Sequence, residues 1–155
     1  MPRISTLIIL ALAVWCLALP QRLHADPSLP PMSVEDMGRL LRAEAPTAVV
    51  VMASWCGPCR GELPRLNQVY NELKDRGLRM VGVSLDIRPA PMVKMLRDVP
   101  ADFPFYWVGE KAMAAFDIRS VPMLFLSRNG KLHKSLPGAH SVESLRQSLG
   151  ALLEK

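Results

Sequence analysis

The sequence contains very little cysteine. Three of its 155 residues are cysteine, and the two that follow residue 25 stand close together, at positions 56 and 59. Small domains that depend on disulfide bonds usually spread several cysteines along the chain. A bridge between positions 56 and 59 would close so short a loop that it would remove little entropy from the unfolded state. The cysteine content therefore excludes a disulfide framework as the basis of the fold.

Ligands for a metal are equally scarce. A structural zinc site needs about four ligands, and after residue 25 the chain adds only His133 and His140 to its two cysteines. The spacing of these histidines does not match the compact ligand pairs of zinc sites. The formal net charge of +5 is modest and scattered along the chain, which argues against a nucleic-acid surface. We expect no bound metal, no other cofactor and no nucleic-acid partner.

The longest apolar run is short for a membrane-spanning helix. Residues 4–19 carry no charge, follow Arg3 and precede Pro20. This run of 16 residues falls short of the roughly 20 that usually cross a bilayer. A basic start, an apolar stretch and a small residue, here Ala25, are typical of a secretory signal. We predict that residues 1–25 are a signal peptide; the alternative is an uncleaved anchor, which would be the only contact with a membrane.

The remainder of the chain has the composition of a folded domain. In the whole sequence of 155 residues, 50% are hydrophobic, which suffices for a core. Residues 26–32 form a proline-rich lead-in that we expect to be extended and solvated, and residues 33–155 form one domain. Residues 47–53 are continuously apolar and β-branched, as in a strand buried on both faces of a parallel sheet. Further strands are expected at 78–85 and 103–108, and helices from Ser33 to Pro46, from the cysteines to Gly77, around 92–96 and at 111–116.

The carboxyl-terminal part of the sequence predicts a hairpin followed by a last helix. Residues 123–127 and 132–136 flank an Asn129-Gly130 pair, which predicts a tight hairpin because both residues accept positive φ. Ser141 is expected to cap a last helix. The order of elements predicts an α/β sandwich whose mixed central sheet has parallel strands first and an antiparallel hairpin at the end.

The position of the two cysteines gives them a chemical role. They fall between a buried strand and the start of a helix, where unpaired backbone N–H groups and the helix dipole stabilise a thiolate. Cys56 is therefore expected to attack a substrate disulfide, and Cys59, one turn further inside, to resolve the mixed disulfide. A pair of unreactive buried cysteines is the alternative, but it does not explain this position.

The stretch W-C-G-P-C-R-G-E-L-P at residues 55–64 resembles the active site of the thioredoxin superfamily. With the predicted export signal it is similar to the TlpA-like extracytoplasmic branch, and the resemblance covers roughly residues 33–155. It implies a thioredoxin-like three-layer sandwich and thiol–disulfide exchange, mostly the reduction of protein disulfides, as in cytochrome c maturation or at copper-site thiols. It also implies a periplasmic location and a transmembrane thiol–disulfide reductase as electron donor.

The resemblance assigns roles to further residues. Pro122 matches the cis-proline that faces the cysteines, and Val121 before it would offer its backbone to a substrate; a trans proline at the start of a strand is the alternative. Trp55 would shield the sulfurs and contact the substrate, although plain packing is the alternative. Glu62 matches an acidic residue that could move protons for Cys59 if burial raises its pKa; a solvated glutamate is the alternative.

The sequence also departs from the family pattern. Val50 stands six residues before Cys56, where thioredoxins have a buried aspartate and many TlpA-like proteins have asparagine. Valine cannot transfer a proton, which leaves Glu62 or Asp86, although we expect Asp86 to cap the next segment. Met123 replaces the more usual threonine after the proline, and we expect it near the substrate groove.

Three other functions stay open at the level of sequence. The same dithiol would serve a disulfide oxidant or isomerase. Two sulfurs with a methionine would suit a Cu(I)-binding chaperone. A redox-inactive binding module would retain its function without either cysteine.

Overall fold

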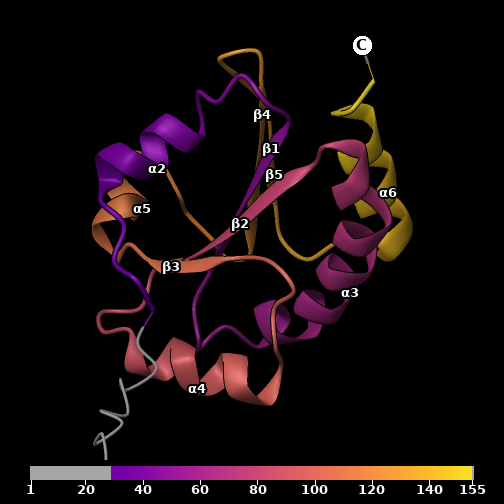
Figure 1. The fold of residues 1–155 in the computed structure, drawn as a ribbon. Helices are drawn as coiled ribbons and strands as arrows, with labels where there is room; N and C mark the ends of the chain where they lie inside the picture. Colours follow the sequence, from indigo (N-terminus) through magenta and orange to yellow (C-terminus); the bar gives the residue numbers. More distant parts are fainter. Residues whose placement is uncertain (1–28, 155) are drawn as a thin grey trace, which may run out of the picture.

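The computed structural model describes residues 29–154, so the predicted signal peptide or anchor at 1–25 lies outside the described residues. Within this part of the chain, a five-stranded sheet has the order β3-β2-β1-β4-β5 and is seen nearly edge-on in Figure 1. The strands are β1 (Thr47–Met52), β2 (Arg79–Ser84), β3 (Phe105–Trp107), β4 (Met123–Arg128) and β5 (Lys131–Pro137). The helices are α2 (Val34–Leu40), α3 (Gly57–Leu73), α4 (Ala90–Asp98), α5 (Lys111–Ala115) and α6 (Val142–Ala151), and the 3-10 turn η1 (Lys74–Arg76) follows α3.

The central strand β1 determines how the sheet is built. It pairs with β2 in parallel and with β4 antiparallel, and all six of its residues are buried. Alternate side chains enter two separate cores, with Val50 in one and Val49 in the other. This burial on both faces is the reason for the continuous apolar run in the sequence.

Helices cover both faces of the sheet. Helices α3 and α6 lie on one face and α2 and α5 on the other (Figure 1). Helix α4 adds Met92 and Met95 to the core under α3. The predicted three-layer α/β sandwich with a mixed sheet is therefore confirmed. None of the helices between residues 29 and 154 has the length and apolar character needed to cross a membrane.

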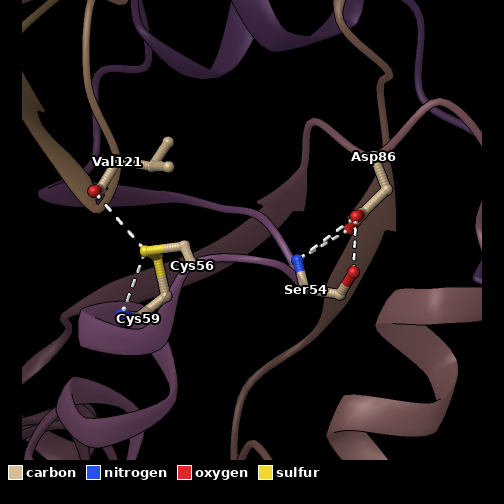
Figure 2. The surroundings of a disulfide bond; sticks show 5 residues. All are labelled: Ser54, Cys56, Cys59, Asp86 and Val121. Carbon is tan, nitrogen blue, oxygen red and sulfur yellow. Dashed lines mark hydrogen bonds between the residues drawn. A yellow bond between two sulfur atoms is a disulfide. The ribbon is translucent and has the colours of Figure 1, made fainter.

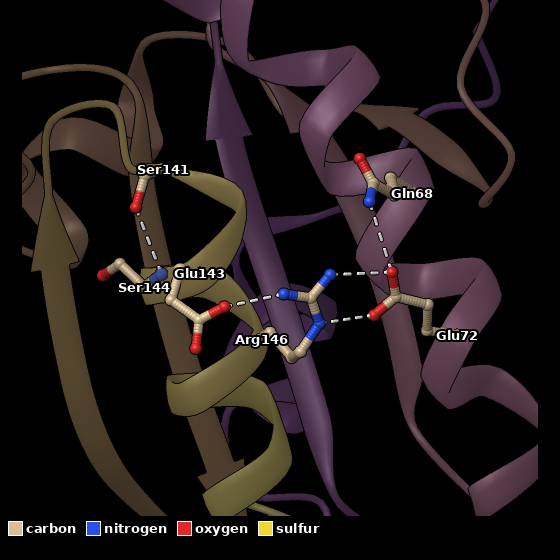
Figure 3. A network of polar contacts seen from close by, with 6 residues as sticks. All are labelled: Gln68, Glu72, Ser141, Glu143, Ser144 and Arg146. Carbon is tan, nitrogen blue, oxygen red and sulfur yellow. Dashed lines mark hydrogen bonds and ion pairs between the residues drawn. The ribbon is translucent and has the colours of Figure 1, made fainter.

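Helices α3 and α6 are also joined at their surface. The guanidinium of Arg146 donates to both carboxylate oxygens of Glu72, at 2.7 and 2.9 Å, and Glu143 lies on the other side of the same guanidinium (Figure 3). Ser141 caps α6 by accepting from the N–H of Ser144, as predicted. Exposed ion pairs of this kind contribute little to stability, so the apolar contacts beneath them hold the two helices together.

The hairpin was predicted correctly, whereas the end of a neighbouring helix was not. Asn129 and Gly130 have φ values of 52° and 71°, as the turn requires. Their N–H groups donate to the carbonyls of Glu44 and Ala43. Helix α2 ends at Leu40, so the prediction that it continues to Pro46 was wrong. The chain tightens there, because the N–H groups of Arg42 and Ala43 donate to the carbonyls of Arg39 and Leu40, three residues back.

The lead-in is not simply solvated, which corrects the prediction for its described part. The N–H of Met32 donates to the carbonyl of Trp107 at 2.9 Å, and the N–H of Trp107 donates to the carbonyl of Pro30 at 3.0 Å. These bonds cover the outer edge of β3. Sheet edges expose unpaired backbone groups, and the lead-in satisfies several of them.

Candidate functional site

Cys56 and Cys59 form a disulfide at the amino terminus of α3 (Figure 2), with their Cα atoms 5.3 Å apart. Cys56 is the N-cap of the helix, and its Sγ accepts a hydrogen bond from the N–H of Cys59 at 3.2 Å. The side chain of Cys56 retains 5% exposure, whereas Cys59 is fully buried. Cys56 is therefore the more exposed of the two, as the sequence predicts for the attacking cysteine, and Cys59 the more buried, as it predicts for the resolving cysteine.

The segment before β4 faces this disulfide. The Val121–Pro122 peptide bond is cis, as the resemblance implied. The carbonyl oxygen of Val121 lies 3.5 Å from Sγ of Cys56 (Figure 2). The carbonyl of Pro122 accepts from the N–H of Gly138 at 2.8 Å, which ties this segment to the end of β5. The structure thus brings together the cysteine motif, the Val121–Pro122 segment and the end of β5.

Asp86 holds the residues that lead into the cysteine motif. Its buried carboxylate accepts from the N–H of Ser54 at 3.1 and 3.2 Å and from the Ser54 hydroxyl at 2.6 Å (Figure 2). The hydroxyl of Ser84 donates to the same carboxylate at 2.7 Å. The expected capping role was wrong, because α4 has Pro89 as its N-cap and no side-chain cap. β1 and β2 are parallel neighbours, so their carboxyl ends meet and Asp86 faces Ser54.

Glu62 is buried and has one histidine as its partner. Its side chain is 4% exposed, and its Oε1 accepts from the backbone N–H of His140 at 2.8 Å. Burial raises the pKa of the Glu62 carboxyl above its ordinary value, although His140 and Arg65 act in the opposite direction. The alternative of a solvated glutamate is therefore wrong. Sequence reasoning noted His140 only as a possible metal ligand and did not find this contact.

The remaining predicted residues divide between surface and core. Trp55 is 69% exposed, which contradicts plain packing and leaves its indole beside the motif open to a partner. Met123 is buried in the core on the α2 face, so its expected place in a groove was wrong. Val50 is buried in the same cluster as Cys59. Among residues 29–154, no group of three or more His, Cys, Asp or Glu side chains could hold a metal ion.

In this site a disulfide lies at the start of a helix, and a cis-proline directly before strand β4 of a mixed sheet faces it. This is the arrangement of a thioredoxin-type dithiol site. A family model described as thioredoxin-like matches residues 44–132, more than half of the chain. The chain belongs to the thioredoxin-like family.

Proteins of known name are similar to this chain in sequence. The thiol-disulfide oxidoreductase ResA of Oceanobacillus iheyensis is 27% identical over 95 residues, which cover 60% of this chain and 50% of that protein. The thioredoxin of Rickettsia typhi is 24% identical over 106 residues, which cover 68% of this chain and 80% of that protein. The chain thus spans only half of the length of the ResA protein that it matches.

Solved structures agree with the fold. A Chlorobium tepidum structure, described as a thiol:disulfide interchange protein DsbE, has a TM-score of 0.69 and 28% identity and covers 82% of this chain and 92% of its own. StoA from Bacillus subtilis has a TM-score of 0.59 and 23% identity and covers 67% of this chain and 81% of its own. The relationships to ResA and DsbE support the resemblance to the TlpA-like branch.

Proposed function

We propose that the protein is an exported thiol–disulfide oxidoreductase that reduces disulfides of substrate proteins with Cys56 and Cys59. The observation that carries this proposal is the disulfide at the start of α3, whose two cysteines differ in their exposure to solvent. Cys56 is the N-cap and keeps 5% of its surface exposed, whereas Cys59 is fully buried. Membership of the thioredoxin-like family and the relationship to ResA support the same chemistry.

The reaction proceeds through a mixed disulfide. In the reduced protein, the Cys56 thiolate attacks one sulfur of the substrate disulfide, which breaks that bond and releases the other sulfur as a thiolate. The Cys59 thiolate then attacks Sγ of Cys56. The Cys56–Cys59 disulfide forms, the mixed disulfide breaks, and the substrate leaves with two electrons. Since an extracytoplasmic compartment is oxidising, a transmembrane thiol–disulfide reductase must return the two electrons.

Glu62 exchanges protons with Cys59 in this scheme. It follows Cys59 by three positions on α3, and residues with this spacing share a helix face. A carboxyl with a pKa raised by burial is suited to proton transfer near neutral pH. As a carboxylate, Glu62 accepts the Cys59 proton before resolution; as a carboxylic acid, it protonates the Cys59 thiolate after the disulfide is reduced.

The segment around the cis-proline positions the substrate. The backbone of Val121 lies next to the attacking sulfur, with its carbonyl oxygen 3.5 Å away, and Pro122 has no N–H that would need a partner. An extended substrate segment pairs with the Val121 backbone, and Trp55 covers its apolar side chains. Clients with a reducible cysteine pair, such as apocytochrome c or a copper-binding protein, suit this arrangement, and their place of maturation puts the protein in the periplasm.

A trapping experiment tests the proposal. Cys59→Ser leaves Cys56 to form mixed disulfides that cannot be resolved, so expression of this variant in the periplasm should capture clients that release on reduction. The matched controls are Cys56→Ser and the double variant, which should capture none. If Cys59→Ser captures no protein while Cys56→Ser still complements a deletion, the proposed mechanism is wrong.

A further inference from the structure

His140, in the loop between β5 and α6, makes two hydrogen bonds to helix α3. Its backbone N–H donates to Oε1 of Glu62 at 2.8 Å, and its carbonyl accepts from Nη1 of Arg65 at 2.9 Å. Glu62 and Arg65 are one helical turn apart, so both backbone groups of His140 are held by one face of α3. This double attachment fixes the imidazole relative to the Glu62 carboxyl.

The imidazole of His140 is placed to act on that carboxyl. Its Nδ1 lies 3.5 Å from Oε1 of Glu62, within ion-pair distance. Nδ1 is buried and makes no hydrogen bond within residues 29–154. The His140 side chain is 16% exposed, compared with 4% for Glu62. The ring is thus mostly buried beside the carboxyl and keeps a small part of its surface exposed.

Few charged groups act on Glu62. They are the His140 imidazole from the β5–α6 loop and the Arg65 guanidinium from α3 itself, and both oppose the effect of burial on its pKa. Arg65 is effectively always charged, whereas an imidazole can gain or lose its charge near neutral pH. The His140 imidazole is also the group whose Nδ1 lies 3.5 Å from the Glu62 carboxyl, so its replacement tests this environment directly.

We propose that His140 is a positioning residue that controls the protonation of Glu62 through the imidazole held beside its carboxyl. The proposal rests on the proton-transfer role of Glu62 proposed above. When the disulfide is reduced, Cys59 leaves as a thiolate and takes the proton of the Glu62 carboxyl. Glu62 then regains a proton from water, and the charge of the neighbouring His140 imidazole affects how readily the carboxyl holds that proton. When a substrate is reduced, the protons move in the opposite direction, and the electrons stay in thiol–disulfide exchange.

The direct test follows the ionisation of Glu62 without using activity. The ¹³C signal of its side-chain carboxyl is recorded against pH in the oxidised native protein, in His140→Gln and in the matched control His133→Gln. His133 is exposed on β5, where its ring contacts the carbonyl of Arg128. Loss of the positive charge at position 140 should move the Glu62 midpoint to higher pH, and the control should leave it in place. An unmoved midpoint in His140→Gln overturns the proposal.

The second test connects this ionisation to the reaction. The rate of mixed-disulfide resolution is measured against pH with a small disulfide substrate in native protein, His140→Gln, Glu62→Gln and the double variant. Below the midpoint of Glu62, each pH unit of upward shift lowers its ionised fraction tenfold, so the acid limb should move to higher pH in His140→Gln. No further change is expected when His140→Gln is added to Glu62→Gln. An equal effect in both backgrounds shows that His140 does not act through Glu62 and overturns the proposal.

The outcomes separate this inference from the proposed role of Glu62. A shifted ¹³C midpoint with unchanged rates supports control by His140 and contradicts proton transfer by Glu62. Rates that depend on Glu62, with a midpoint that His140→Gln leaves in place, contradict control by His140. The two backbone bonds do not need the imidazole, so we expect the variant to fold; His140→Asn provides a second uncharged variant if glutamine does not fit.

Discussion

The carboxylate of Asp86 binds Ser54 through both the backbone N–H and the hydroxyl, across 32 positions of sequence. Asp86 follows β2, and Ser54 stands two residues before the Cys56 N-cap. The bond thus fixes the turn that leads from the central strand into α3. The geometry of the disulfide depends on this turn as well as on the helix.

Removal of the Asp86 carboxylate should destabilise the protein. Asp86→Ala removes the acceptor of the buried Ser84 hydroxyl and of the N–H and hydroxyl of the half-buried Ser54. Unsatisfied buried groups cost about 1–3 kcal/mol each, partly offset here by the loss of a buried charge. We expect the free energy of unfolding of the oxidised protein in urea to fall by about 1–3 kcal/mol. The control, Asp75→Ala at an exposed position, should change it by less than about 0.5 kcal/mol; equal losses in both variants would contradict the role of Asp86.

Local patterns in the sequence predicted most of the fold. Residues 47–53 could be recognised as a central strand because both faces of β1 are buried. The hairpin could be predicted because the positive φ of Asn129 and Gly130 is a property of those residues. The end of α2 at Leu40 was not predicted, because Pro46 was the only helix-ending residue visible in this part of the sequence.

The candidate site was predicted less completely. Cys56 and Cys59 belong to a motif whose spacing is visible in the sequence, whereas the cis form of Val121–Pro122 was expected only from the resemblance to the thioredoxin superfamily. The partner of Glu62 is His140, 78 positions later, and no periodicity relates residues so far apart. Ser54 was missed for the same reason, because its role depends on the meeting of two strand ends. Trp55 matched the motif, but only the structure shows its exposure.

The buried Glu62 should make stability depend on pH. Burial raises its pKa in the folded state above the ordinary value of 4.5. Between these two values the folded protein binds more protons than the unfolded chain, so stability falls as the pH rises through that window. Gln at position 62 does not titrate, so Glu62→Gln should gain stability relative to the native protein as the pH rises above 4.5. Urea unfolding at several pH values measures this gain.

The matched control for that series is Glu35→Gln, at an exposed position in the first turn of α2. It should not reproduce the gain. A difference between Glu62→Gln and the native protein that stays constant from acidic to neutral pH would show that burial does not affect the ionisation of Glu62.

The two cysteines of the reduced protein should react in a fixed order. Cys56 is partly accessible at the helix start, whereas Cys59 has no exposed surface. Limiting iodoacetamide should therefore label Cys56 first, because the thiolate that is stabilised and reachable reacts. Peptide mapping by mass spectrometry measures the label at each position, and denatured protein, labelled at both, serves as the control. Equal labelling of Cys56 and Cys59 in the native state would contradict their assigned roles.

Trp55 should matter for protein substrates and not for the fold. Its side chain is 69% exposed, so Trp55→Ala should change the free energy of unfolding by less than about 0.5 kcal/mol. An exposed tryptophan that becomes covered at an interface often contributes more than about 1 kcal/mol. We expect kcat/KM for reduction of a protein disulfide to fall by about fivefold to tenfold, while reduction of a small disulfide stays unchanged, because a small substrate does not reach the indole.

The matched control for Trp55→Ala is Leu132→Ala. Leu132 is another exposed apolar residue, 47% accessible, but it lies beside the hairpin turn, at the opposite end of β4 from Pro122. Its removal should leave both rates unchanged. If Trp55→Ala slows the small and the protein substrate equally, the indole acts on the sulfurs themselves. If neither rate changes, the substrate is held by the Val121 backbone without help from Trp55.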